Sequence, residues 1–136
     1  MKKPSPTCAI LADRHAAVVD GIRGLLESAF ESVFMVADIG SLSNGAKRLK
    51  PDLIILDLSL VGGDLPGLLG DITAQSPASR LIVITLHDEP TVPHLAFSAG
   101  AHGVVLKRCV GRDFLDAVDT VLRGGRFVSP DFGVAA

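Results

Sequence analysis

The sequence contains no tryptophan and no tyrosine, and its aromatic surface comes from six phenylalanines among 136 residues. Proteins that hold single-stranded nucleic acid by base stacking need exposed aromatic rings, and this chain offers few. A net charge of -2 and an isoelectric point near 6.0 also lack the positive excess that a stand-alone nucleic-acid binder presents. Both shortages argue against direct nucleic-acid binding by these residues.

Cysteine and long apolar stretches are scarce as well. The two cysteines, Cys8 and Cys109, are too few and too far apart for a disulfide framework or a metal motif, and they suit a reducing cytosol. No apolar run reaches the roughly 18 residues that a membrane-spanning helix needs, and residues 1–6 lack the apolar core of a secretory signal. We therefore expect a cytoplasmic protein that does not enter a membrane.

Short β-branched apolar runs alternate with helical patterns along the chain, whose hydrophobic fraction is 48%. Such runs are typical of strands that are buried on both faces of a parallel sheet. We predict strands at about 7–12, from Phe34 onward, and at about 52–57, 80–86 and 103–106. We predict helices at about 14–30, 41–49, 65–75, 91–99 and 111–123.

Several of these helices carry recognisable faces and ends. The spacing predicts that the first helix buries Val18, Ile22, Leu25 and Ala29. Ser41 is the expected N-cap of the second helix, and Gly100 is expected to end the fourth in a left-handed conformation. The last helix has a clear apolar face made of Phe114, Leu115, Val118, Val121 and Leu122.

Five strands in alternation with five helices predict an α/β fold. The expected architecture is a (βα)5 doubly wound parallel sheet of the flavodoxin-like kind, with strand order 2-1-3-4-5. The length allows one domain of ordinary size. We assign residues 1–6 to a flexible leader, 7–126 to the domain, and 127–136 to a C-terminal tail or the start of a linker.

Four predicted strands lead into polar side chains, which are Asp13, Asp57, Thr85 and Lys107. In open α/β sheets the ligand lies outside the carboxyl ends of the strands, so we expect one crevice to hold all four. The set suits a carboxylate that accepts a phosphoryl group. It supplies an acceptor, a second acid, a hydroxyl to orient an oxygen, and an ammonium to balance the added charge.

Each of these residues also has a simpler interpretation. Asp57 could be a strand-end carboxylate in a turn, and Asp13 could be a helix N-cap. Thr85 could be an ordinary β-branched strand residue, and Lys107 could be a solvated strand end. The four histidines, His15 among them, show no metal-ligand spacing on a shared helix face, so we assign them loop and surface roles.

Four short motifs at these strand ends resemble the receiver domain of bacterial two-component response regulators. They are Leu11-Ala12-Asp13-Arg14-His15, Leu56-Asp57-Leu58, Ile84-Thr85 and Leu106-Lys107. Segments 85–90, 99–103 and 123–130 resemble the NarL/FixJ subfamily more specifically. The likeness covers roughly residues 7–130, and the four motifs in order are a far stronger signal than any one of them.

The resemblance implies a role for each residue at the predicted crevice. Asp57 would accept a phosphoryl group from a sensor histidine kinase. Asp13, Asp57 and the backbone carbonyl of Ser59 would hold Mg²⁺. Thr85 would hydrogen-bond a phosphoryl oxygen, and Lys107 would pair with the phosphoryl group.

The resemblance also implies a phosphorylation-controlled switch and not an enzyme. Members of the subfamily usually carry a helix-turn-helix DNA-binding domain after the receiver, and Ala136 falls where a linker would begin. DNA would then be bound only through such a C-terminal domain. Homodimer contacts would form through the first and last helices.

The chain departs from the family pattern at four positions. Arg14 stands where the family usually has a second acid that ligates the metal. Val104 replaces the Tyr or Phe that rotates on activation. We therefore expect the coupling of phosphorylation to the output through a rotating ring to be weaker or to follow another path. Arg108 follows the site lysine in place of the common Pro or Asp, and Val61 replaces a usual proline.

Arg14 is the departure with the largest expected effect. Three carboxylates and a lysine leave the usual empty site strongly negative, whereas Asp13, Asp57, Lys107 and Arg14 together are close to neutral. Opposite charges about 4 Å apart are worth up to about 4 kcal/mol at an effective dielectric of 20. We therefore predict weakened Mg²⁺ binding. Two alternatives stay open: the guanidinium binds phosphoryl oxygens in place of the metal, or it swings out.

Two other classes of function compete with the phosphorylation switch: a degenerate receiver, and an enzyme or flavin carrier on the same scaffold. The same departures are compatible with a degenerate receiver, used as a binding or dimerisation module without phosphoryl chemistry. A flavin carrier on this scaffold would need a Ser/Thr/Gly-rich phosphate loop after the first strand, where Asp13-Arg14-His15 stands instead. A hydrolase would need a nucleophile with an adjacent base and oxyanion donors, and the sequence shows no such set.

Overall fold

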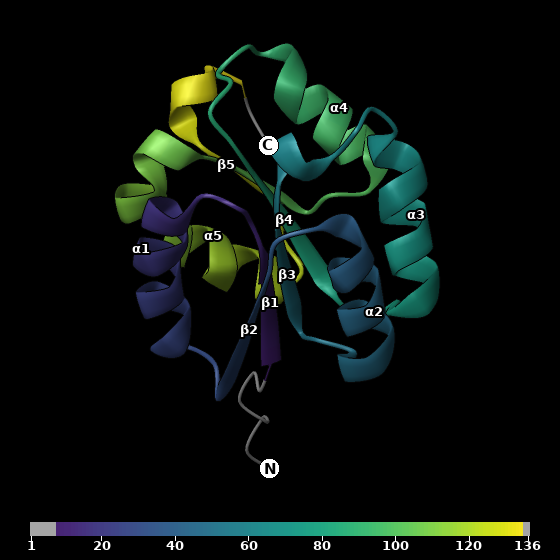
Figure 1. Ribbon diagram of the computed structural model, residues 1–136. Coiled ribbons are helices and arrows are strands. Elements are labelled where there is room, and N and C mark those ends of the chain that lie inside the picture. Colours follow the sequence, from purple (N-terminus) through teal and green to yellow (C-terminus); the bar gives the residue numbers. More distant parts are fainter. Residues whose placement is uncertain (1–7, 135–136) are drawn as a thin grey trace.

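The protein is a single parallel sheet covered by helices on both faces (Figure 1). The computed structural model describes residues 8–134, and within them it leaves the side chains of residues 16–19 undescribed. The strands are β1 (Cys8–Ala12), β2 (Ser32–Val36), β3 (Leu53–Asp57), β4 (Arg80–Thr85), β5 (Gly103–Leu106) and β6 (Phe127–Val128). The helices are α1 (Ala16–Glu27), α2 (Ile39–Leu49), α3 (Leu65–Gln75), α4 (Thr91–Ala99) and α5 (Val110–Leu122). Short 3-10 turns are η1 (Leu58–Leu60), η2 (Lys107–Cys109) and η3 (Pro130–Phe132).

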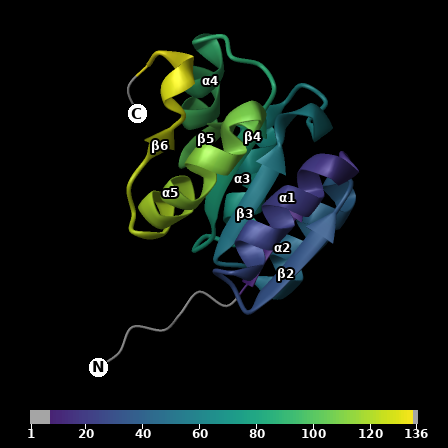
Figure 2. The same ribbon diagram turned by 90° about the vertical axis from the view of Figure 1, so that its left-hand side faces the viewer.

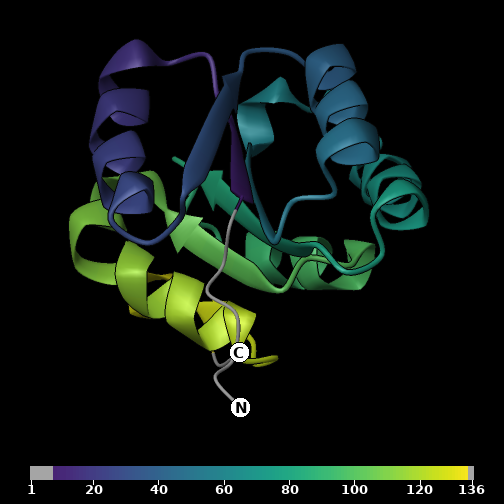
Figure 3. The ribbon, with the colours of Figure 1, turned by 90° about the horizontal axis from the view of Figure 1, so that it is seen from below.

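The strand order is β2-β1-β3-β4-β5-β6, and every pair of neighbours is parallel. The predicted flavodoxin-like order of the first five strands is confirmed. Viewed from below, α1 and α5 cover one face while α2, α3 and α4 cover the other (Figure 3). None of the helices within residues 8–134 is both long and apolar enough to cross a bilayer.

Two hydrophobic cores lie on opposite faces of the sheet because side chains alternate along each strand. The core on the side of α2, α3 and α4 includes Ile10, Ile54, Val83 and Val104. The core on the side of α1 and α5 includes Leu11, Ile55, Ile82 and Val105. Every residue of β3 is buried, which explains why the sequence shows a continuous apolar run and not an alternating one.

The first helix is shorter than predicted, and its buried face differs. It ends at Glu27, so Ala29 lies beyond it and is exposed. Ile22 is buried as expected, but Leu26 and Phe30 fill the next core positions, and Leu25 is only half-buried. Leu26 and Phe30 continue the four-residue spacing from Ile22, which keeps them on the sheet side. The predictions for Val18 and for the leader at 1–6 lie outside the described residues.

The N-cap of α2 is Asp38, and the prediction of Ser41 for that role is wrong. Asp38 accepts hydrogen bonds from the backbone N–H of Ser41 at 2.7 Å and from its hydroxyl at 3.1 Å. These bonds hold the pKa of Asp38 below its usual value. An aspartate caps as well as a serine, so the helix begins at Ile39, two residues before Ser41.

The C-terminal end of α4 and most of the buried face of α5 agree with prediction. Gly100 ends α4 with φ 113°, a left-handed conformation that glycine adopts without a steric penalty. On α5, Phe114, Val118 and Val121 are buried against the sheet as expected. Leu115, which was expected on that face, is 48% exposed.

The segment expected to be a tail or linker instead packs against the domain as a C-terminal strap, defined here as residues 127–132. Its first two residues form β6 beside β5, and Figure 2 shows this strand at the end of the sheet. The hydroxyl of Ser129 accepts a hydrogen bond from the backbone N–H of Leu106 at 3.0 Å, and Ser129 is fully buried. Phe132 is 3% exposed. The packed body therefore extends at least to Phe132.

Charged side chains hold the other end of the strap. Arg112 donates to both oxygens of Asp113, at 2.7 and 3.0 Å, and to Asp131 of the strap at 2.8 Å. The pKa of the buried Asp113 carboxyl lies below its usual value, first because of the Arg112 hydrogen bonds and then because of one from Ser129. The start of α5 and the strap therefore share one network of ionised groups.

We expect Ser129→Ala to lower the free energy of unfolding by about 1–3 kcal/mol, because it leaves the buried N–H of Leu106 without an acceptor. Urea denaturation followed by circular dichroism measures the change. The matched control is Ser98→Ala on the exposed side of α4, with an expected change within about 0.5 kcal/mol. Equal unfolding midpoints for the two variants would contradict this role for the strap.

Candidate functional site

The four polar residues expected to share a crevice lie at one edge of the sheet. Asp13 follows β1, Asp57 ends β3, Thr85 ends β4, and Lys107 follows β5. These strands are consecutive neighbours in the sheet, so their carboxyl ends open on the same side. Three of the four line one cavity, together with Ser59 of η1.

A buried ammonium joins the two acids. The Nζ atom of Lys107 lies 3.0 Å from Oδ2 of Asp57 and 3.1 Å from Oδ2 of Asp13. The three side chains are only 2%, 2% and 0% exposed, respectively. The contact with Asp13 is an ion pair without the geometry of a hydrogen bond, since Oδ2 of Asp13 has no hydrogen-bond donor. Lys107 is therefore not a solvated strand end.

Asp57 is held in its ionised form. Burial opposes ionisation, but hydrogen bonds from the Ser59 hydroxyl (2.6 Å), Lys107 and the Ser59 backbone N–H (3.1 Å) outweigh it. The pKa of Asp57 consequently lies below its usual value of 3.8. The residue is 1% exposed yet lines the cavity, so a bound group can reach its carboxylate from that side.

Thr85 faces the same cavity and is 1% exposed. Its Oγ1 accepts a hydrogen bond from the backbone N–H of His87 at 3.0 Å. The hydroxyl acts there as an acceptor, which leaves its proton for an acceptor placed in the cavity. Thr85 is thus tied to the loop that leads from β4 to α4.

His15 lies in the loop after β1 with its side chain 47% exposed, as expected, but it also contacts the site, which sequence reasoning missed. Its Nδ1 lies 3.0 Å from Nζ of Lys107, 3.2 Å from Oδ1 of Asp13 and 3.4 Å from Oδ2 of Asp57. The signal that could have found His15 is its place two residues after a strand-end acid.

Asp13 does not cap α1, so that simpler interpretation is wrong. The N-cap position is His15, which makes no capping hydrogen bond with its side chain. Asp13 lies two residues earlier, and its Oδ1 accepts a hydrogen bond from the backbone N–H of His15 at 2.8 Å. This short side-chain turn draws the loop after β1 over the end of the sheet and fixes His15 beside Lys107.

Arg14 reaches across to η1 and does not swing away. Its Nη2 donates to the backbone carbonyl of Ser59 at 3.2 Å, in a solvent-facing position. That carbonyl is the one expected to hold Mg²⁺. The guanidinium therefore binds the backbone of Ser59, the same residue whose hydroxyl binds Asp57.

The resemblance implies a Mg²⁺ site here, and Asp13, His15 and Asp57 each bring one ligand atom to within 4.8 Å of the others. The three oxygens expected to hold the ion nevertheless have cationic neighbours. Lys107 contacts both carboxylates, and Arg14 takes the carbonyl of Ser59. Mg²⁺ requires near-octahedral oxygen ligands, so these residues do not fit that ion in this arrangement.

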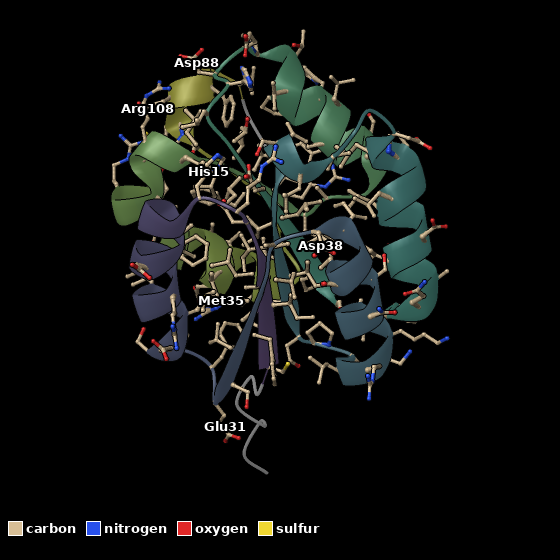
Figure 4. All side chains as sticks on the ribbon, viewed as in Figure 1. His15, Glu31, Met35, Asp38, Asp88 and Arg108 are labelled. Carbon is tan, nitrogen blue, oxygen red and sulfur yellow. The ribbon has the colours of Figure 1, made fainter. Side chains whose placement is uncertain are left out.

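The other altered positions lie away from the cavity lining. Val104 is fully buried within β5, and its carbonyl accepts a hydrogen bond from the backbone N–H of Ser129. Arg108 forms an ion pair with Asp88 at 3.4 Å (Figure 4). Val61 lines a separate apolar cavity beside α3 and α4.

We expect Lys107→Met to lower the free energy of unfolding at pH 7 by about 3 kcal/mol, because it leaves buried carboxylates unpaired. Asp57 has a lowered pKa, so its stabilising effect is present above pH 3.8 and is lost as the pH falls through the lower folded value. The difference in free energy of unfolding between the variant and the wild type should therefore become smaller at acidic pH. Denaturation at several pH values measures it, and Lys47→Met on exposed α2 should change stability by less than about 1 kcal/mol. A deficit independent of pH would contradict the ion-pair assignment.

Comparison with known proteins agrees with this geometry. Residues 9–119 match the family described as the response regulator receiver domain. The oxygen regulatory protein NreC of Staphylococcus haemolyticus is 31% identical over 123 residues, which are 88% of this chain and 56% of that protein. The transcriptional regulatory protein UhpA of Salmonella typhimurium is 33% identical over 128 residues, which are 91% of this chain and 63% of that protein. The chain thus spans a little over half the length of these curated relatives.

Solved structures share the fold along nearly the whole chain. A crystal structure of a LuxR-family two-component response regulator from Aurantimonas sp. SI85-9A1 matches with a TM-score of 0.84 at 30% identity, covering 95% of this chain and 94% of that one. The isolated receiver domain of RcsB from Salmonella enterica serovar Typhimurium matches with a TM-score of 0.80 at 28% identity, covering 93% and 96%. The chain belongs to the response regulator receiver domain family and is a NarL/FixJ-like receiver of the kind found in LuxR-family two-component regulators.

Proposed function

We propose that Asp57 accepts a phosphoryl group from a sensor histidine kinase and that the modified domain switches a partner or a DNA-binding output. The observation that supports this most is the ionised Asp57 carboxylate, which lines a cavity together with Thr85 and Lys107. An oxygen of Asp57 attacks phosphorus, an O–P bond forms, and the N–P bond of the phosphohistidine breaks. The electron pair stays with the imidazole nitrogen of the kinase.

Lys107 and Thr85 have complementary roles in this proposal. Phosphorylation replaces the single charge of Asp57 with a group of up to about two negative charges. The Lys107 ammonium, 3.0 Å from the acceptor oxygen, pairs with that group. The Thr85 hydroxyl donates to a phosphoryl oxygen, and since it also binds the N–H of His87, the loop from β4 to α4 responds.

Because Val104 stands at the position of the rotating ring, phosphorylation has to be coupled to the output by another path. Val104 is buried and has no ring that could rotate, so the change at Thr85 acts through the β4–α4 loop. Asp13, Asp57 and the Ser59 carbonyl would be the Mg²⁺ ligands, and we propose that they bind the ion weakly because Lys107 contacts both carboxylates and Arg14 donates to the carbonyl. A dissociation constant as tight as in receivers with two adjacent acids would contradict this.

We base the proposed output of the whole protein on its relatives. UhpA is described as a transcriptional regulatory protein, and one RcsB structure is described as bound to a promoter in the presence of a phosphomimetic. We propose that this receiver, like theirs, acts in the cytoplasm as a non-enzymatic switch. DNA would be bound only through a C-terminal domain beyond these 136 residues.

A degenerate receiver is the second candidate function. The Arg14 contact with the Ser59 carbonyl favours it, because this contact occupies an expected metal ligand. The buried Val104 favours it as well, because it cannot report phosphorylation by rotating. In that case the domain binds a partner or a second copy through the fold alone.

We expect Asp57→Asn to abolish phosphoryl transfer from a phosphorylated histidine kinase, because the amide removes the nucleophilic oxygen that Lys107 stabilises. Radiolabel transfer measures the effect. The matched control, Asp71→Asn on exposed α3, should transfer at the wild-type rate. Labelling of the Asp57→Asn variant would contradict Asp57 as the acceptor, and no labelling of the wild type by any donor would favour the degenerate receiver.

We expect phosphorylation to promote a homodimer through α1 and α5, which lie side by side on one face (Figure 2). Leu115 supports this surface because it projects from α5 with 48% exposure. Light scattering over a concentration series measures the molar mass, and Leu115→Ala should weaken association. A monomer mass that does not depend on concentration or on phosphorylation argues against the dimer.

A further inference from the structure

The candidate site already contains the positive charge that a phosphoryl group needs. Lys107 and Arg14 carry two positive charges against the two carboxylates of Asp13 and Asp57. A divalent cation added to this set would make the empty site strongly positive and would have to displace both side chains from their oxygens. This balance of two positive and two negative charges therefore opposes the binding of a metal ion before phosphorylation and favours an incoming anion.

Arg14 is placed to meet that anion. One N–H of its guanidinium is used on the Ser59 carbonyl, which leaves four donors in a planar fork. Ser59 also binds both oxygens of Asp57, so the contact fixes Arg14 next to the loop that carries the acceptor. A guanidinium in this place can bind two phosphoryl oxygens at once.

We propose that this receiver takes up a phosphoryl group without a divalent metal ion, with the Arg14 guanidinium and the Lys107 ammonium as the cations. The inference rests on the proposed acceptor role of Asp57. The phosphoryl group comes from an acyl phosphate or a phosphorylated imidazole. The bond from phosphorus to the donor breaks, a bond to a carboxylate oxygen of Asp57 forms, and the electron pair leaves with the donor.

The test compares phosphorylation of the full chain by acetyl phosphate in EDTA and in MgCl2, scored on phosphate-affinity gels. We expect equal rates for the wild type in both buffers. Arg14→Gln should slow the reaction in EDTA by about 100-fold, as when one charge-stabilising donor is removed from an active site. Arg23→Gln, a matched change on exposed α1, should match the wild type. Thermal unfolding of each variant establishes that it is folded.

A second variant separates charge from folding. Arg14→Asp restores an acid beside Asp13, so its reaction should stop in EDTA and return with MgCl2. Calorimetry gives a readout independent of phosphorylation: Arg14→Asp should bind Mg²⁺ with measurable heat, and the wild type should not.

Each outcome decides a different point. Phosphorylation of the wild type only with MgCl2 overturns the metal-free proposal and leaves the acceptor role of Asp57 intact. Absence of phosphorylation in both buffers, while a metal-dependent receiver reacts alongside, overturns the acceptor role as well. Equal losses in Arg14→Gln and Arg23→Gln overturn the role of Arg14.

Discussion

The site depends on a single buried ammonium between two buried acids. The side chains of Asp13 and Asp57 are 2% exposed or less, and the Lys107 ammonium in contact with both compensates for the hydration that buried carboxylates lose. Lys107 can do so because β5 ends one residue before it, and β5 is fixed by β4 on one side and by the strap on the other. The paired strands thereby set the position of the charge.

The same ammonium constrains which cations the site can accept. In a pocket with an excess of acids, a lysine and a metal ion can share the negative charge. Here Lys107 contacts both carboxylates, and Arg14 adds a second positive charge at the Ser59 carbonyl. A substitution at one position therefore changes the chemistry of the pocket without changing the fold.

Most of the fold could be predicted from sequence because the buried strands are continuous apolar runs and the crossovers of a parallel sheet have a fixed hand. The grouping of Asp13, Asp57, Thr85 and Lys107 followed from the same rule. The sixth strand could not be predicted, since two residues show no periodicity and pair only because Ser129 and Phe132 anchor them. His15 was missed because its role depends on a turn made by the Asp13 side chain and not on spacing.

Thr85 and Lys107 are connected by a path of contacts on the surface, which does not involve the buried Val104. Thr85 binds the N–H of His87, the next residue, Asp88, pairs with Arg108 at 3.4 Å, and Arg108 follows Lys107. Both partners of this ion pair are at least half exposed, so it contributes little to stability. A weak link between two elements is easily broken and reformed. The path from Thr85 to Lys107 can therefore rearrange without unfolding the cores beneath it.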